Sequence, residues 1–266
     1  MTADVSRDGV VLIGCGRLGS AMLEGWLATG AVAGSDLIIL SPSEKPAAEA
    51  ARGRGARINP PLDALRQAKT VVLAVKPAMW RDALTPLVSY LNHEVIIVSV
   101  MAGVRSEDVF NVSGRPVARV MPTTAVAQAQ GVAAIWSDDA WALETAKALF
   151  EPVADVAPLD DEALMDAATA VAGSAPAFIY AFVQGLADAG VAQGLSPEAA
   201  ARLARGALRS AGAGLETGEG LDALIARIAS PGGTTRAGLD AMADGGDLTR
   251  AAETAVSAAV ARARSL

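Results

Sequence analysis

Short apolar runs alternate with helical stretches along the chain up to residue 157. The runs that predict strands are residues 10–13, 36–40, 70–75, 94–100 and 115–121. Residues 70–75 are apolar and rich in β-branched side chains, which is typical of a strand buried on both faces. Strands that alternate with helices pair in parallel and carry helices on both faces of the sheet. The pattern therefore predicts a doubly wound, mostly parallel α/β sheet.

The alternation stops near residues 156–158, and from Asp160 onward the pattern is helical. We therefore expect two domains, an α/β domain at residues 1–157 and an all-α domain at residues 158–266. One helix of the second domain is predicted to begin at Ser196 and Pro197, because serine caps helices and proline suits the first helical position.

Another predicted helix of the second domain carries two adjacent stripes. An apolar stripe with i, i+3, i+4 spacing consists of Phe178, Ile179, Phe182, Val183 and Leu186. A strip of small residues repeats every four positions and consists of Ala177, Ala181, Gly185 and Ala189. Small residues allow the close approach of another helix. That helix belongs either to a second copy of the chain, in an intertwined dimer, or to the same chain, and the pattern leaves both open.

Three glycines follow the first predicted strand with the spacing G-x-G-x-x-G. They are Gly14, Gly16 and Gly19, and a helical stretch begins directly after them. Strand, glycine turn and helix start in this order indicate a Rossmann dinucleotide site. Gly14 permits the tight turn, Gly16 lets the backbone approach a pyrophosphate, and Gly19 lets helix and strand pack closely. Cys15, inside the turn, is interpreted as a small tolerated side chain.

The end of the second predicted strand bears on the choice of cofactor. An acidic residue there typically binds the ribose hydroxyl of NAD. This strand instead runs into Ser41, Ser43, Glu44 and Lys45. Hydroxyls beside a cation suit a 2′-phosphate, and Arg17 in the glycine turn adds charge. We therefore expect NADP(H), with NAD(H) as the second choice.

Ligands of an open parallel sheet bind outside the carboxyl ends of its strands. Lys76 and Pro77 follow the third strand, and Ala102 and Gly103 follow the fourth. These loops are expected to line one crevice with the stretch 119–124, near a nicotinamide ring. Lys76 is either a contact of cofactor or substrate there, or an exposed lysine.

Two stretches of the helical domain carry hydroxyl groups. Residues 230–235 read Ser-Pro-Gly-Gly-Thr-Thr before a predicted helix at 236–242. Their donors predict a site for a small carboxylate, although a well-capped turn has the same sequence pattern. Residues 169–176 are predicted to form a break between two helices, with Ser174 as the cap of the second helix. The hydroxyl of Thr169, one turn before the break, is expected to be free to face a crevice.

Composition narrows the classes of function. The formal charge of −7 argues against a nucleic-acid surface. Residues 1–9 show no signal sequence, and no apolar run is judged long enough for a membrane span, so we expect a soluble cytoplasmic protein. Cys15 and His93 are the only residues of their types, which excludes Cys-rich and His-based metal sites. His93 is interpreted as a solvated turn residue.

Together these stretches resemble the pyrroline-5-carboxylate reductases, nearly end to end. The resemblance rests on the motifs at 13–16, 74–77, 101–104, 119–122, 173–178 and 230–235. It implies a Rossmann domain followed by a helical dimerisation domain, with dimers that can assemble into rings. It further implies reduction of 1-pyrroline-5-carboxylate to L-proline, the last step of proline biosynthesis. A cyclic imine can arrive protonated, so hydride transfer needs positioning rather than a strong acid.

The resemblance also implies roles for individual residues. Cofactor contacts would come from Gly14, Gly16, Arg17, Leu18, Gly19, Ser41, Ser43, Asn59, Ala74, Val75, Lys76, Pro77, Ala102 and Gly103. The substrate carboxylate would bind Ser230, Gly232, Gly233, Thr234 and Thr235. Thr169 would bond the ring nitrogen, and Lys76 is the second catalytic candidate.

The chain departs from the family pattern at three positions. Thr123 and Ala125 stand where the family usually has asparagine and proline, and Arg17 stands where it commonly has asparagine or glutamine. Two further hypotheses therefore stay open, a reductase of a six-membered cyclic imino acid and a nucleotide-binding regulatory protein on the same scaffold.

Overall fold

The computed structural model describes residues 9–265, which form two compact units. The first unit comprises the chain up to Gly173 together with its end from Ala259, and the second is Ser174–Ala258. We describe each unit by itself. The division into units rests on contacts between residues and places the end of the chain with the first unit. The predicted boundary between domains at residues 157 and 158 stays a prediction.

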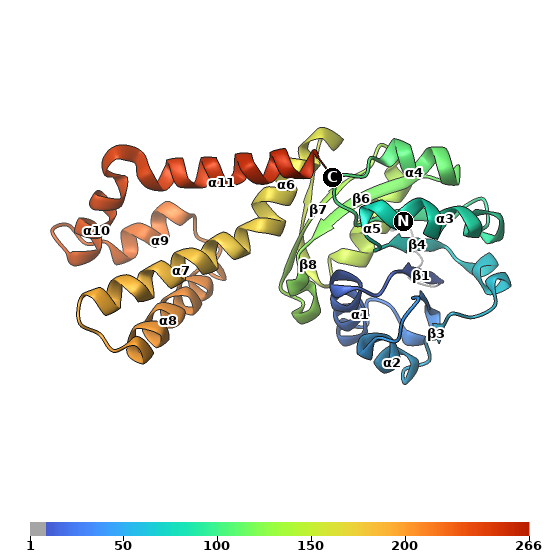
Figure 1. Cartoon of the computed structure of the whole chain (residues 1–266), viewed down its shortest axis with the longest axis horizontal. Coiled ribbons are helices and arrows are strands. Elements are labelled where there is room, and N and C mark those ends of the chain that lie inside the picture. Colours follow the sequence, from blue (N-terminus) through green and yellow to red (C-terminus); the bar gives the residue numbers. More distant parts are fainter. Residues whose placement is uncertain (1–8, 266) are drawn as a thin grey trace. The chain divides into compact units, whose positions relative to one another are not determined.

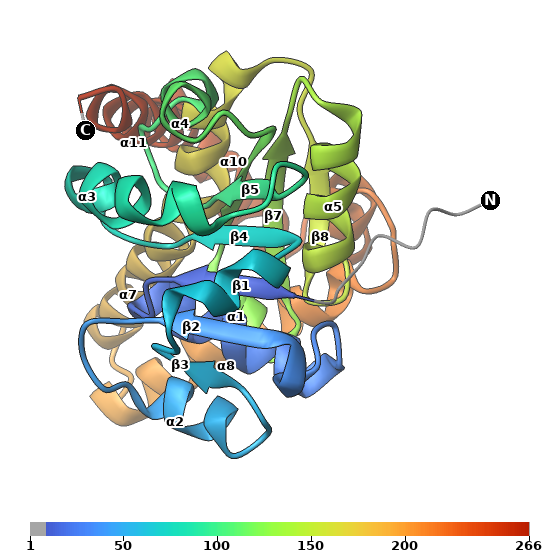
Figure 2. The same cartoon turned by 90° about the vertical axis from the view of Figure 1, so that its right-hand side faces the viewer.

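The first unit contains a doubly wound sheet (Figures 1 and 2). Its strands are β1 (Val10–Ile13), β2 (Leu37–Leu40), β3 (Arg57–Ile58), β4 (Thr70–Leu73), β5 (Ile96–Ser99), β6 (Val117–Pro122), β7 (Gly131–Trp136) and β8 (Ala154–Pro158). They lie in the order β3-β2-β1-β4-β5-β6-β7-β8, and only the β6–β7 pair is antiparallel. The predicted mostly parallel sheet is thus confirmed.

The antiparallel pair has a simple cause. Only the short turn Thr124–Gln128 and its flanking residues join β6 to β7, and a parallel crossover needs a dozen or more residues. The chain therefore returns as a hairpin. The sequence analysis did not predict β3, β7 or β8.

Helices cover both faces of the sheet (Figure 2). Those of the first unit are α1 (Arg17–Thr29), α2 (Pro46–Arg52), α3 (Trp80–Leu84), α4 (Ser106–Ser113), α5 (Ala140–Phe150) and α6 (Met165–Ala168). Along β1, Val10 and Leu12 belong to one apolar core, and Val11 and Ile13 belong to the core on the other face. This alternation explains why the strands are apolar throughout.

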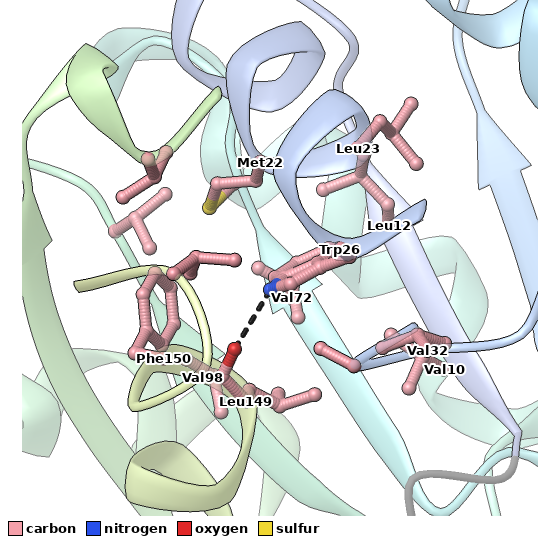
Figure 3. Packing of buried hydrophobic residues seen from close by; sticks show 14 of the residues in the cluster. Val10, Leu12, Met22, Leu23, Trp26, Val32, Val72, Val98, Leu149 and Phe150 are labelled. Atoms are coloured by element: carbon pink, nitrogen blue, oxygen red, sulfur yellow. Dashed lines mark hydrogen bonds between the residues drawn. The ribbon is translucent and has the colours of Figure 1, made fainter. Parts of the chain in front are cut away.

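Trp26 of α1 anchors one of these cores (Figure 3). Its side chain is fully buried, and its Nε1 donates a hydrogen bond of 2.8 Å to the carbonyl oxygen of Leu149. Its ring meets that of Phe150 edge to face, with centroids 6.0 Å apart. The indole thus joins α1 to the end of α5 by both packing and a hydrogen bond.

The second unit is helical, as predicted. Its helices are α7 (Ala175–Ala192), α8 (Pro197–Leu215), α9 (Leu221–Ile228), α10 (Thr234–Ala243) and the part of α11 (Asp247–Ala263) that precedes Ala259. Helices α7 and α8 pack side by side through Ala187, Ala200 and Ala204 (Figure 1). Ser196 caps α8, as predicted, because its Oγ accepts from the backbone N–H of Ala199 at 3.2 Å.

The predicted break at residues 169–176 is wrong. The chain passes from α6 to α7 through a π-helical turn, Thr169–Ser174, and Ser174 makes no side-chain cap. Pro176 lacks an N–H group, and its ring crowds the carbonyl four residues before it. A widened π turn accommodates that proline without ending the helix.

The expectation that no segment is long and apolar enough for a membrane span is also wrong for one stretch. Within the helical residues Glu162–Ala192, the most apolar window of 18 residues has a mean hydropathy of 1.4, and 11% of that window is buried. Single glycine and hydroxyl residues interrupt its apolar runs, and the many alanines between them keep the mean hydropathy high. Length and composition alone do not distinguish a membrane span from an apolar interface, so the exclusion of a membrane stays a prediction.

Candidate active site

The glycine turn between β1 and α1 has the backbone that the motif predicts. Gly14 adopts a φ of +97°, which L side chains rarely adopt, and an added Cβ would lie 2.7 Å from the carbonyl oxygen of Ala74. At Gly19 an added Cβ would lie 2.3 Å from the carbonyl oxygen of Gly14. Both positions therefore require glycine, Gly14 for the turn and Gly19 for the close packing of helix and strand.

Gly16 differs from these two glycines because the space beside it is open. It is the N-cap of α1, it is exposed, and an added Cβ would meet no atom within 4 Å. The first turn of α1 contains no acidic residue, and Arg17 is exposed there. The N-terminal N–H groups and the positive end of the helix dipole therefore suit a pyrophosphate. Cys15 is buried in the turn.

The end of β2 is held by Asn59 from the end of β3. The Oδ1 of Asn59 accepts from the Ser41 N–H at 3.0 Å, and its Nδ2 donates to the Ser41 carbonyl at 2.8 Å. The buried Ser41 hydroxyl donates to the Ser43 carbonyl at 2.8 Å, while Ser43 itself is exposed. Asn59 thus braces the loop that was predicted to bind the adenosine phosphate.

The loops after β4 and β5 lie at the same edge of the sheet, because the two strands are parallel neighbours. Lys76 is exposed at the start of a short turn, Pro77–Met79, and Ala74 and Val75 are half-buried. Gly103 has a φ of +72°, and Ala102 packs against a small buried cluster. The predicted crevice residues of the first unit therefore share one edge.

That cluster brings α6 to the edge of the sheet. Met165 of α6 is buried with Met121 and Ala134, and Ala102 packs against them. The hydroxyl of Thr169 donates to the Met165 carbonyl at 2.7 Å, so the prediction of a free hydroxyl is wrong. Helical threonines commonly bond the carbonyl four residues before them. The Thr169 oxygen keeps its lone pairs and can still accept a hydrogen bond.

A buried ion pair in this region was not predicted. Arg119 of β6 donates from Nη1 to Glu162 Oε1 at 3.0 Å, and the two side chains are 5% and 12% exposed. Glu162 also accepts from the N–H of Ser106 at 2.7 Å and from its hydroxyl at 2.9 Å. A charged residue in the apolar strand 117–121 was the available signal, because a buried charge requires a partner.

Thr123, at the end of β6, belongs to the β6–β7 hairpin. Its Oγ1 accepts from the N–H of Val132 at 3.2 Å, and its own N–H donates to the Val132 carbonyl at 3.0 Å. Thr123 and Ala125 are both half-buried. The hydroxyl thus closes the turn and keeps its proton available for donation.

His93 is exposed in the turn before β5, as predicted.

In the second unit, the loop at residues 230–235 forms the entrance to α10. Gly233 is the N-cap of α10, Gly232 has a φ of +71°, and the Gly233 N–H donates to the Ser230 carbonyl at 3.0 Å. Thr234 and Thr235 are exposed in a first turn that contains no acidic residue. Two hydroxyls and the N–H groups of a ten-residue helix suit a carboxylate.

Two family descriptions match the chain. Residues 162–266 match "pyrroline-5-carboxylate reductase dimerisation", and residues 9–103 match "NADP oxidoreductase coenzyme F420-dependent". The pyrroline-5-carboxylate reductase of Pseudomonas aeruginosa is 33% identical, over 88% of each chain. That of Mycobacterium tuberculosis is 32% identical, over 97% of this chain and 96% of its own.

Solved structures are similar over nearly the whole chain. A pyrroline-5-carboxylate reductase from Coxiella burnetii has a TM-score of 0.88 at 24% identity and covers 98% of both chains. The Plasmodium falciparum pyrroline carboxylate reductase with NADP bound has a TM-score of 0.80 at 24% identity and covers 97% of both. At these identities the structures show a shared fold.

Proposed function

Because the chain belongs to the pyrroline-5-carboxylate reductase family, we propose that it reduces 1-pyrroline-5-carboxylate to L-proline with NADPH. The observation that carries this proposal is similarity to enzymes of that name across most of the chain. The open glycine turn in the first unit and the donor-rich loop in the second supply matching sites for a dinucleotide and a carboxylate.

The first unit provides the cofactor site in this proposal. Gly14, Gly16, Arg17, Leu18 and Gly19 hold the pyrophosphate, since the open space at Gly16 and the N-terminus of α1 fit an anion. Ser43 meets the 2′-phosphate, with Ser41 held in place by Asn59. Residues 74–77 with Ala102 and Gly103 border the nicotinamide ribose. When bound, the cofactor supplies a hydride.

The second unit provides the carboxylate site. Ser230, Gly232, Gly233, Thr234 and Thr235 form the site for the substrate carboxylate, with the hydroxyl groups and the free N–H groups of the first turn of α10 as donors, while the Gly233 N–H holds the loop through the Ser230 carbonyl. Binding it orients the ring and needs no titrating group, so catalysis is largely positioning.

Thr169 is the candidate for the ring nitrogen. Its proton is committed to the Met165 carbonyl, so its oxygen presents lone pairs. An iminium N–H is a donor, and an oxygen that accepts from it favours the protonated, electrophilic form of the ring. Lys76 is the second catalytic candidate; its exposed ammonium adds positive charge at the crevice edge.

The helical domain associates with a second copy of the chain, as its family description indicates. We propose α7 as the main contact, because Phe178, Ile179, Phe182 and Leu186 are exposed in the single chain. An added Cβ at Gly185 would meet no atom within 4 Å, so the small strip has room for a partner helix. Rings of dimers and a cytoplasmic location belong to the same proposal.

The test is loss of NADPH absorbance in the purified protein with 1-pyrroline-5-carboxylate and, in parallel, its six-membered homologue. Faster turnover of the five-membered ring supports the proposal. Faster turnover of the six-membered ring would assign the chain to another cyclic imino acid. NADPH binding without turnover of either would favour the regulatory alternative.

A further inference from the structure

Glu162 lies where three parts of the first unit meet. Its carboxylate accepts hydrogen bonds from Ser106, the first residue of α4, and from Arg119 in β6. Ser106 directly follows the loop that begins with Ala102 and Gly103, and Arg119 lies two residues before Met121. Glu162 itself opens the short helical turn Glu162–Leu164 that leads into α6. We call residues 162–168, which comprise this turn and α6, the connector. The Glu162 carboxylate therefore joins the connector to α4 and to β6.

The neighbouring acidic residue shows that this contact fixes the register of the connector. Asp161 caps the same turn, since its Oδ1 accepts from the N–H of Ala163 at 2.8 Å. Asp161 and Glu162 thus have separate partners, one within the turn and one across the crevice edge. A slip that brought Ala163 to the position of Glu162 would leave Arg119 buried without an anion, which is strongly unfavourable, and the opposite slip would offer only the shorter side chain of Asp161, which already caps the turn.

The register of the connector determines where Thr169 lies. Met165 follows Glu162 by three residues and Thr169 follows it by seven, so all three lie along one face of the helical segment. Met165 is buried against Met121, and the Thr169 hydroxyl bonds the Met165 carbonyl. A displacement of the connector would therefore carry the Thr169 oxygen with it.

We infer that Glu162 is a positioning residue for reduction of the imine, holding α6 so that Thr169 accepts from the ring nitrogen. This inference rests on the proposed function. Buried ion pairs contribute little net stability compared with apolar packing, and their attested use is to specify register. Glu162 belongs to the connector, whereas the three groups that donate to it belong to α4 and β6. These hydrogen bonds therefore fix the position of the connector relative to the sheet.

The test is a double-mutant cycle with Glu162→Gln and Thr169→Ala. Glutamine keeps the size of the side chain but removes the charge and one acceptor. We expect Glu162→Gln to lower kcat/KM for the imine about tenfold in the wild-type background. In the Thr169→Ala background, the loss should be about twofold or less, because coupled residues are not additive. The Kd for NADPH should stay within about twofold, since the glycine turn is untouched.

Asp160→Asn is the matched control, because it removes the same charge from an exposed neighbour two residues away and should leave the rate unchanged. Equal losses from Glu162→Gln in both backgrounds would overturn the inference, and so would a parallel rise in the Kd for NADPH. If Glu162→Gln does not fold, Ser106→Ala removes one donor only and should give a smaller loss with the same dependence on Thr169.

Amide hydrogen exchange separates this inference from the proposed function. Without any substrate, Glu162→Gln should speed exchange across residues 163–170, whereas Asp160→Asn should not. Wild-type protein that fails to reduce the imine would refute the proposed function and with it the role of Glu162 in positioning Thr169 for that reaction. Unchanged exchange in Glu162→Gln would overturn the positioning argument even if the wild-type enzyme is active.

Discussion

The brace between Asn59 and Ser41 leads to a prediction about cofactor affinity. Asn59 has a φ of 45°, a left-handed conformation that asparagine tolerates better than alanine. Its side chain makes two hydrogen bonds to the backbone of Ser41. Substitution by alanine removes both bonds and strains the backbone, whereas substitution by glycine removes the bonds only.

The magnitude follows from these contacts. Two hydrogen bonds contribute about 2 kcal/mol together, and alanine in the left-handed region adds about 1 kcal/mol of strain. If the loop loses these bonds, it must be ordered when the cofactor binds, and the free energy of ordering weakens the binding by the same amount. Asn59→Gly should therefore raise the Kd for NADPH up to about thirtyfold, and Asn59→Ala should raise it further.

Fluorescence titration with NADPH and NADH measures the effect. NADH lacks the 2′-phosphate that Ser43 is proposed to meet, so its Kd should change less than that of NADPH. Asn111→Ala, at an exposed asparagine of α4, is the control and should leave both values unchanged. If the Kd for NADPH stays within about twofold of wild type in both Asn59 variants, the loop at Ser41 is not part of the cofactor site.

Three further predictions concern other regions. Ser43→Asp should raise KM for NADPH more than KM for NADH, because a carboxylate repels the 2′-phosphate; equal changes would remove Ser43 from the site. Thr235→Ala should raise KM for the imino acid about tenfold with little change in the Kd for NADPH, and an unchanged KM would contradict the carboxylate assignment. Trp26→Phe should lower the free energy of unfolding by about 2–4 kcal/mol in urea titrations, since it leaves the Leu149 carbonyl unpaired; an unchanged midpoint would refute this.

Local conformational requirements were readable from the sequence. Gly14 and Gly19 meet backbone atoms that exclude any side chain, so the spacing of the glycines alone predicted the turn. The apolar run in β4 likewise follows from burial on both faces of the sheet. Strands β7 and β8 were missed because their short segments include several alanines, which disfavour strands, and pairing within the sheet overrides that preference.

The junction at residues 169–176 shows the limit of local signals. Glycine, serine and proline in succession are typical of a helix break. Here the chain continues helically through a π turn, and α6 packs against β7 and the Met121 cluster at the edge of the sheet. Tertiary packing thus decided a conformation that the local sequence pattern disfavours.

By itself, the sequence determined the sheet type, the glycine turn and the residues that carry the hydroxyl groups, because each depends on neighbours a few positions apart. Only the tertiary structure decided how those groups are used. It showed that the Asn59 side chain bonds the backbone of Ser41, eighteen residues earlier, and that the Thr169 hydroxyl donates its hydrogen bond to the Met165 carbonyl. It also paired Arg119 with Glu162, 43 residues later. A charged residue in an apolar strand indicates that a partner is required, but only the fold determines which carboxylate comes within hydrogen-bonding distance.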